Sequence, residues 1–159
     1  MSASNQLKAL IFDVDGTLAE TERDGHRPAF NQAFMDAGLD WQWSEERYGE
    51  LLEVSGGKER IRAFVQQSKP DFVLPQGFED LTAFIKHLHA SKTQYYKQYA
   101  QEGRIPLRPG VERLLNEARE KGVRLAIATT TTPANVQALL ENTLGAARLP
   151  WFEVIAAGA

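Results

Sequence analysis

The sequence contains no cysteine among its 159 residues. This absence excludes disulfide bonds, thiolate metal sites and a cysteine nucleophile, and it is compatible with a reducing cytoplasm. No hydrophobic stretch reaches membrane-spanning length, and the short apolar run near the N-terminus leads straight into an acidic motif, unlike a cleavable signal. We therefore expect a cytoplasmic protein; plastid stroma is the alternative for a photosynthetic eukaryote, although the sequence shows no transit peptide.

An excess of charge of one sign is also lacking. The formal net charge is −3 and the isoelectric point is near 5.7, which leaves no basic footprint for nucleic acid or for an anionic membrane surface. A chain of this length can bury a sizeable core and favours one domain, with two lobes as the open alternative. We expect a small molecule as the partner.

Within the segment Ala9–Leu18, an apolar run stops at two aspartates and a glycine. Continuous apolar residues predict a strand covered on both faces, and open α/β sheets bind ligands at the carboxyl ends of such strands. Asp13 would lie at that end, where a carboxylate can attack phosphorus if a divalent cation neutralises the phosphoryl oxygens. Asp15 is placed to handle the leaving-group proton, and Gly16 permits the turn.

Helical patterns separate this first strand from two later ones. Phe30, Phe34 and Met35 recur at helical spacing, which predicts a first helix. Further helices are predicted near Ser44, after Gly57, from Phe78 past Tyr99, over residues 111–120 and from Thr132 as N-cap. Strands are predicted at residues 123–128 and 151–157. This order predicts an α/β fold with a parallel sheet.

The run Asp13-Val14-Asp15-Gly16-Thr17 resembles the first signature motif, DxDGT, of the haloacid-dehalogenase-like phosphohydrolases. The resemblance implies a Rossmann-like core, incomplete here, that is interrupted by a helical cap. Residues 1–19 and 104–159 would form the core and residues 20–103 the cap. It also implies that Asp13 is the nucleophile that forms an aspartyl phosphate and that Asp15 is the general acid and then the base. Both aspartates would bind Mg²⁺, Asp13 through its side chain and Asp15 through its carbonyl.

Further segments resemble the CbbY-type sugar-bisphosphate phosphatases, relatives of β-phosphoglucomutase. They are residues 21–27, 41–43, 56–60, 107–110 and 155–158. The likeness runs across the whole chain and implies a phosphorylated sugar as substrate, with xylulose-1,5-bisphosphate as the best single choice. A β-phosphoglucomutase-like mutase remains an alternative, as does a catalytically incomplete fragment that acts only by binding.

Two groups of residues are candidates for binding the phosphates of such a substrate. Thr129, at the place of the family's second motif, and Thr130 offer hydroxyls and backbone amides at a strand-to-helix turn. Lys58 and Arg60 offer cations for a distal phosphate at a glycine-led helix start. The alternatives are a polar strand end for Thr129 and solvated charges for Lys58 and Arg60.

His26 and Glu20 are candidates for contacting the sugar. His26 resembles the cap histidine that approaches the reacting hydroxyl in the mutase relatives; the alternative is a histidine hydrogen-bonded on a helix. Glu20 offers an acceptor for substrate hydroxyls, or serves only as a hinge residue. Trp41 and Trp43 are expected to pack the cap rather than to line a site.

The resemblance also implies a third-motif lysine and a fourth-motif acidic pair after the third strand. The last lysine is Lys121, and beyond Thr129 the acidic side chains are Glu141 and Glu153, neither at the expected spacing. We therefore expect an incomplete Mg²⁺ site and no efficient phosphatase activity from these residues alone. We also expect the first strand to form an exposed edge of the core that is prone to self-association. A truncated gene product, a piece of a longer protein and a chain completed by a partner all remain open.

Overall fold

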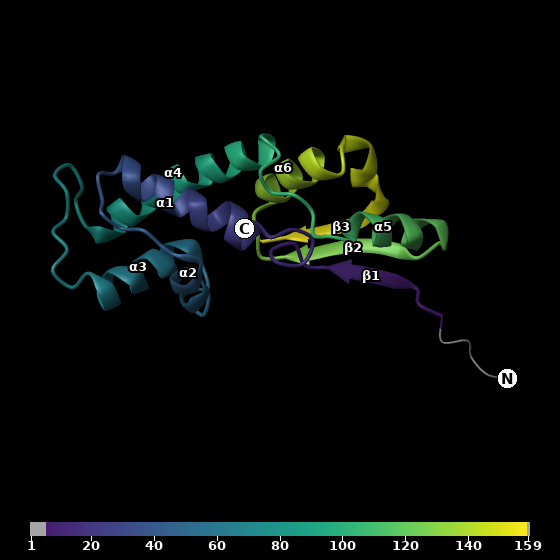
Figure 1. Ribbon diagram of the computed structural model, residues 1–159, viewed down its shortest axis with the longest axis horizontal. Helices are drawn as coiled ribbons and strands as arrows, with labels where there is room; N and C mark the ends of the chain where they lie inside the picture. The colour runs from purple at the N-terminus through teal and green to yellow at the C-terminus, as the bar shows by residue number, and fades with distance from the viewer. Residues whose placement is uncertain (1–5, 159) are drawn as a thin grey trace. The chain divides into compact units, whose positions relative to one another are not determined.

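A computed structural model describes residues 6–158, and the chain divides into two compact units. Met1–Gly25 with Lys97–Ala159 form the sheet unit, and His26–Tyr96 form the helical unit. In chain order the elements of Figure 1 are β1 (Ala9–Phe12), the π-helical turn η1 (Glu22–His26), α1 (Arg27–Asp36), α2 (Glu45–Leu51), α3 (Gly57–Ser68), α4 (Leu81–Gln101), α5 (Val111–Glu120), β2 (Arg124–Thr129), α6 (Pro133–Thr143), the 3₁₀ helix η2 (Ala146–Trp151) and β3 (Phe152–Ala157). None of these helices, within residues 6–158, is long and apolar enough to span a bilayer.

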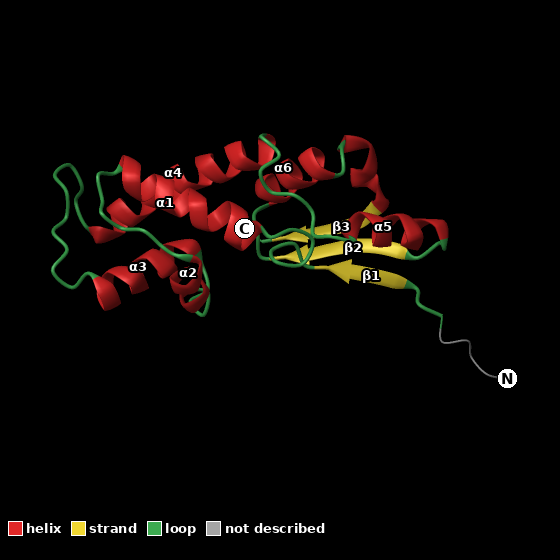
Figure 2. Cartoon of the chain, viewed as in Figure 1, coloured by secondary structure: helices red, strands yellow, loops and turns green. Residues whose placement is uncertain are grey.

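The sheet unit contains a parallel sheet in the order β1-β2-β3. Both connections step in the same direction between neighbouring parallel strands, and right-handed crossovers then place their helices on one face of the sheet. Figure 2 shows α5 and α6 on one side of the three strands. Leu125 and Ile127 are buried in β2, whereas Ile11 and Val154 are exposed. The predicted α/β fold with a parallel sheet is confirmed.

The later strands and helices of the sheet unit lie close to where the sequence predicts them. The strands predicted at 123–128 and 151–157 are observed at Arg124–Thr129 and Phe152–Ala157, and the helix predicted at 111–120 is α5. Thr132 is the N-cap of α6, followed by a proline, but its side chain makes no capping hydrogen bond. The helix start therefore follows from the backbone conformation and the proline ring.

The helical unit is held together by an aromatic core. Trp43 is fully buried, and its ring lies 4.8 Å from that of Phe30 and 4.9 Å from that of Phe34, measured between centroids. Asn31 locks the backbone of Trp43 in place, because its carboxamide accepts from the Trp43 amide at 2.7 Å and donates to the Trp43 carbonyl at 3.0 Å. Met35, which the spacing grouped with the two phenylalanines, is 65% exposed and lies outside this core.

Two helix starts in this unit are set by polar side chains. Ser44 caps α2 as predicted, accepting a hydrogen bond from the Arg47 amide at 3.1 Å. The helix predicted from Phe78 begins instead at Leu81, because Asp80 accepts from the Ala83 amide at 2.7 Å. An aspartate that satisfies an amide of the first turn fixes the boundary of a helix more sharply than apolar spacing does.

Candidate active site

The loop after β1 presents both aspartates of the signature motif. Val14 is buried and its carbonyl accepts from the amides of Thr17 and Leu18, which closes a tight turn. Gly16 has a φ of 73°, a conformation that side-chain-bearing residues adopt rarely. Asp13 is exposed at the end of the strand, and its Oδ1 accepts from the Val14 amide at 2.7 Å. The strand therefore ends where the sequence predicts the nucleophile.

Asp15 is half-buried and held by two hydroxyls. Thr21 donates to its Oδ1 at 2.5 Å, and Thr131 donates to its Oδ2. The first hydroxyl comes from the segment after the turn, and the second from the loop between β2 and α6. A hydroxyl can donate or accept, so this pair can hold the carboxyl in either protonation state. The structure thus ties the β1 loop to the β2 loop through Asp15.

The consecutive threonines that begin at Thr129, the last residue of β2, make different contacts. Thr129 is half-buried, and its hydroxyl accepts from the Thr131 amide at 3.2 Å while remaining able to donate. Thr130 is exposed, and its backbone packs against Gly158, where an added Cβ would lie 2.4 Å from the Thr130 carbonyl oxygen. Thr131, which sequence reasoning missed, is the member that reaches Asp15.

Arg108, also missed from the sequence, joins the aspartate loop to the segment before α5. Its amide donates to the Leu18 carbonyl at 2.8 Å, and its guanidinium donates to the Gly16 carbonyl at 2.5 Å. Its Nε lies 3.0 Å from Oε1 of Glu20. Glu20, a predicted substrate ligand, is therefore paired with a cation, and Arg108 holds the turn that carries Asp15.

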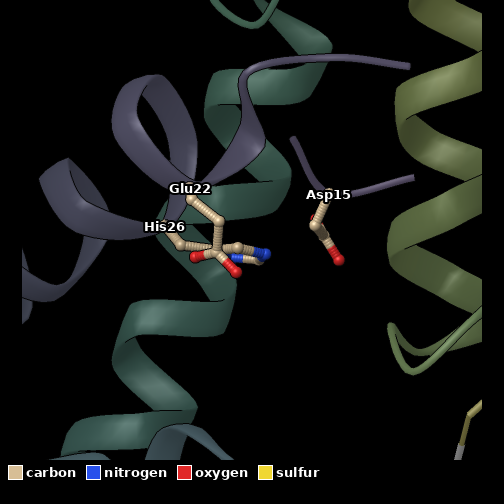
Figure 3. A group of neighbouring side chains, drawn as sticks. All are labelled: Asp15, Glu22 and His26. Carbon is tan, nitrogen blue, oxygen red and sulfur yellow. The ribbon is translucent and has the colours of Figure 1, made fainter. Parts of the chain in front are cut away.

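A second carboxylate lies beside Asp15. Figure 3 draws Asp15 on the loop after β1, with Glu22 and His26 on η1. Carboxylate oxygens of Asp15 and Glu22 lie within 4.8 Å of one another. The Asp13 carboxylate, the Asp15 carbonyl and the Glu22 carboxylate are hard oxygen donors of the kind that Mg²⁺ prefers, so the donor chemistry of the sheet unit fits that ion.

The helical unit contains the remaining candidates. His26 is buried, and its ring stacks on Tyr96 with 4.2 Å between centroids. Lys58 is exposed on the first turn of α3. Arg60, in contrast, is only 8% exposed and donates to the carbonyls of Leu51 and Val54 and to the Tyr48 hydroxyl. Lys58 and Arg60 are only two residues apart, yet Lys58 is exposed to solvent and Arg60 is buried.

His89 on α4 packs against the start of α3. A Cβ added to Gly57 would lie 2.7 Å from Nε2 of His89. Burial is the main cause that lowers the pKa of His89 from 6.5 to about 4, followed by the charges of Lys92 and Lys58. Glu59 opposes this shift and His26 adds to it. The imidazole is consequently neutral at neutral pH, which suits a group beside two lysines.

A family assignment follows from comparison with known proteins. The family model described as haloacid dehalogenase-like hydrolase matches residues 7–158. The match covers nearly the whole chain, and the fold and the aspartate loop agree with it. The chain belongs to the haloacid dehalogenase-like hydrolases.

Individual relatives narrow the likeness to CbbY proteins. Protein CbbY of Rhodobacter capsulatus is 51% identical over 153 residues, which are 96% of this chain and 63% of that protein. The CBBY-like protein of Arabidopsis thaliana is 36% identical over 159 residues, 98% of this chain and 50% of that protein. The chain thus spans between half and two thirds of the length of these relatives.

Two crystal structures of a CbbY protein superpose on this chain. The crystal structure of CbbY from Rhodobacter sphaeroides in complex with phosphate superposes with a TM-score of 0.78 at 45% identity, covering 96% of this chain and 64% of that one. A variant of the same protein, in complex with xylulose-1,5-bisphosphate, gives a TM-score of 0.78 at 44% identity over the same shares.

Proposed function

We propose that the protein carrying this sequence is a Mg²⁺-dependent phosphatase of sugar phosphates or bisphosphates. The observation that carries the proposal is the arrangement at the end of β1. There Asp13 is exposed to solvent, while Asp15, two residues on, is held by the hydroxyls of Thr21 and Thr131. One carboxylate is accessible to a substrate and the other is oriented by fixed partners, which suits a nucleophile and a proton-transfer group respectively.

The proposed reaction has two steps, transfer of the phosphoryl group to Asp13 and hydrolysis of the aspartyl phosphate. A carboxylate oxygen of Asp13 attacks phosphorus, the bond to the sugar oxygen breaks, and Asp15 gives that oxygen its proton. Water then attacks the phosphorus of the aspartyl phosphate while Asp15 takes a proton from the water, which releases inorganic phosphate and restores Asp13. The Thr21 and Thr131 hydroxyls serve both steps, because each can donate to the carboxylate or accept from the acid.

Phosphate binding in this proposal uses the loop after β2. The Thr129 hydroxyl donates to a phosphoryl oxygen, and Thr130 adds its exposed hydroxyl at the same strand-to-helix turn. The Asp13 carboxylate and the Asp15 backbone carbonyl would hold Mg²⁺, which when bound would neutralise charge on the phosphoryl oxygens. The Arg108–Glu20 pair keeps the aspartate loop in place during these contacts.

The helical unit acts as a cap that selects the sugar. Lys58 contacts a phosphate distant from the reacting one, and His26 approaches the reacting hydroxyl. Support for xylulose-1,5-bisphosphate as the substrate comes from the complex of the Rhodobacter sphaeroides relative with that compound. Location in the cytoplasm, or in the plastid stroma of a photosynthetic eukaryote, stays a prediction.

The test is phosphate release from xylulose-1,5-bisphosphate by the natural full-length protein, with and without Mg²⁺. Asp13→Asn keeps the shape of the side chain and removes its nucleophilic charge, so turnover should fall by at least a thousandfold, roughly the loss seen when a covalent nucleophile is removed. Asp40→Asn, at an exposed aspartate that pairs with Lys69 in the helical unit, is the matched control and should retain activity.

The same assay separates the alternatives. Isomerisation of hexose 1-phosphates without net phosphate release would favour the mutase. Near-wild-type phosphate release by Asp13→Asn would refute the assignment of the nucleophile. Binding of the bisphosphate without any turnover, in wild type and variant alike, would favour a chain that acts only by binding.

A further inference from the structure

The guanidinium of Arg60 turns back from α3 onto the end of α2. Its Nε donates to the Leu51 carbonyl at 3.0 Å, its Nη1 to the Tyr48 hydroxyl at 3.0 Å and its Nη2 to the Val54 carbonyl at 3.2 Å. The Tyr48 ring lies 5.2 Å from the guanidinium carbon. Only 8% of Arg60 is exposed, and its guanidinium donates to acceptors inside the protein.

Two of these acceptors are backbone carbonyls at and just after the end of α2. The last carbonyls of a helix have no partner within the helix, and the Leu51 carbonyl, which ends α2, accepts from both Arg60 and the Val54 amide, the latter at 3.1 Å. The connection to α3 runs through Gly56, whose φ of 91° gives the chain a sharp change of direction, and the Gly56 carbonyl accepts from the Arg60 amide at 2.9 Å. Arg60 therefore joins the end of α2, the connection and the first turn of α3.

Lys58 faces the other way. Two residues along an α-helix are rotated by roughly 200°, so Lys58 and Arg60 project from opposite faces of α3. Lys58 is exposed and borders a pocket of about 140 Å³, which is also lined by Glu59, Arg62, Thr82, Ile85 and Lys86. One phosphate on the Lys58 side of α3 cannot also reach the buried Arg60 guanidinium.

We propose that Arg60 is a positioning residue for substrate recognition and does not touch the substrate itself. It fixes the 52–56 connection and thereby the start of α3, from which Lys58 reaches the distal phosphate. The role of Lys58 rests on the proposed function. The role of Arg60 in ordering the connection depends only on the contacts of its guanidinium.

Hydrogen exchange tests the structural half without any substrate. Arg60→Met should speed amide exchange in residues 52–58 about tenfold, since it removes the guanidinium donor from the Leu51 and Val54 carbonyls and leaves the first with only the Val54 amide. Arg60→Lys should do the same, because one ammonium cannot reproduce the planar fork. Tyr48→Phe, which removes a single acceptor, should give a smaller increase in the same residues. Arg62→Met, at an arginine that donates to the Thr82 hydroxyl, should leave this exchange unchanged.

Kinetics on the natural full-length protein test the coupling to Lys58. Lys58→Met and Arg60→Met should each lower kcat/KM for xylulose-1,5-bisphosphate about tenfold and leave p-nitrophenyl phosphate almost unaffected. If Arg60 acts only through Lys58, the double variant should be no worse than Lys58→Met alone. Two direct contacts would instead multiply to about a hundredfold loss.

The outcomes separate the two proposals. Unchanged exchange in residues 52–58 of Arg60→Met would overturn the role of Arg60, whatever the kinetics. Near-wild-type bisphosphate kinetics in Arg60→Lys, or multiplicative losses in the double variant, would also overturn it and indicate a direct charge contact. Faster exchange in a protein that shows no turnover at all would support the ordering role and refute only the phosphatase.

Discussion

Protonation of His89 should destabilise the helical unit below neutral pH. The imidazole packs at the start of α3, where burial is the largest cause lowering its pKa to about 4, followed by Lys92 and Lys58. Unfolding returns this pKa to 6.5, so between pH 6.5 and 4 the unfolded chain binds more protons than the folded one. The stability contributed by neutral His89 is therefore present above pH 6.5 and is lost as the pH falls toward 4.

The magnitude follows from the same two pKa values. One pKa unit corresponds to about 1.4 kcal/mol, and the full gap between 6.5 and about 4 would correspond to ~3–4 kcal/mol without solvent screening. The side chain is only partly buried and solvent screens its charge, so we expect about 1 kcal/mol between pH 7 and pH 4.5. Glu59 is the neighbouring group that offsets part of the effect.

Urea unfolding of wild type and His89→Gln at the two pH values measures this contribution. Tryptophan fluorescence reports the helical unit well, because Trp41 and Trp43 are both buried in it. Wild type should lose about 1 kcal/mol more than His89→Gln on going to pH 4.5, a comparison that cancels the titration of all other groups. His87→Gln, at an exposed histidine of the same helix, controls for the substitution. Equal losses in wild type and His89→Gln would refute the reasoning.

Three further outcomes follow from the site and the core. Thr131→Val should lower kcat of the full-length protein about tenfold by removing one hydroxyl from Asp15, with initial rates as the measurement. Thr132→Val, at an exposed threonine of the same run whose side chain makes no capping hydrogen bond, is the matched control. Trp43→Ala should cost about 3–5 kcal/mol in denaturant unfolding, and Trp43→Phe clearly less, since the ring fills the aromatic core. Removing Mg²⁺ with a chelator should abolish phosphate release and adding the ion back should restore it; activity that survives exhaustive chelation would contradict the proposed metal.

The order of elements was predictable because it follows from apolar patterning. The run before Asp13 becomes β1, and the two later apolar runs become the neighbouring parallel strands. Periodicity also located the helices, but not which of their residues are buried: Met35 lies one position after Phe34 and so points away from the core. Patterning determines the face of a helix only to within a residue.

The partners of the site residues could not be read from the sequence. Thr131 reaches Asp15 only because the loop after β2 converges on the loop after β1, and Arg108 reaches Gly16 across 92 positions. Thr21 lies close to Asp15 in the chain, but its contact depends on how the turn folds back. Four consecutive threonines offer the same chemistry, and the loop conformation alone selects the one that reaches Asp15. For Arg60 the sequence supplies a cation near a helix start, whereas its direction depends on the side-chain rotamer.

Self-association through the open face of the sheet is the remaining prediction. Ile11 and Val154 are both paired in register with Ala126, so their side chains share one face, and they are 71% and 58% exposed. Fully burying such a side chain contributes about 1.5–3 kcal/mol, so covering these residues in two copies favours association through this face. Sedimentation of this chain should show oligomers. The double variant Ile11→Thr, Val154→Thr should contain a smaller fraction of oligomers, since threonine keeps strand propensity while adding a hydroxyl. Val73→Thr, at an 83% exposed residue of the helical unit, should leave them intact. A monomeric wild-type chain, or oligomers that persist in the double variant, would rule out this face as the contact.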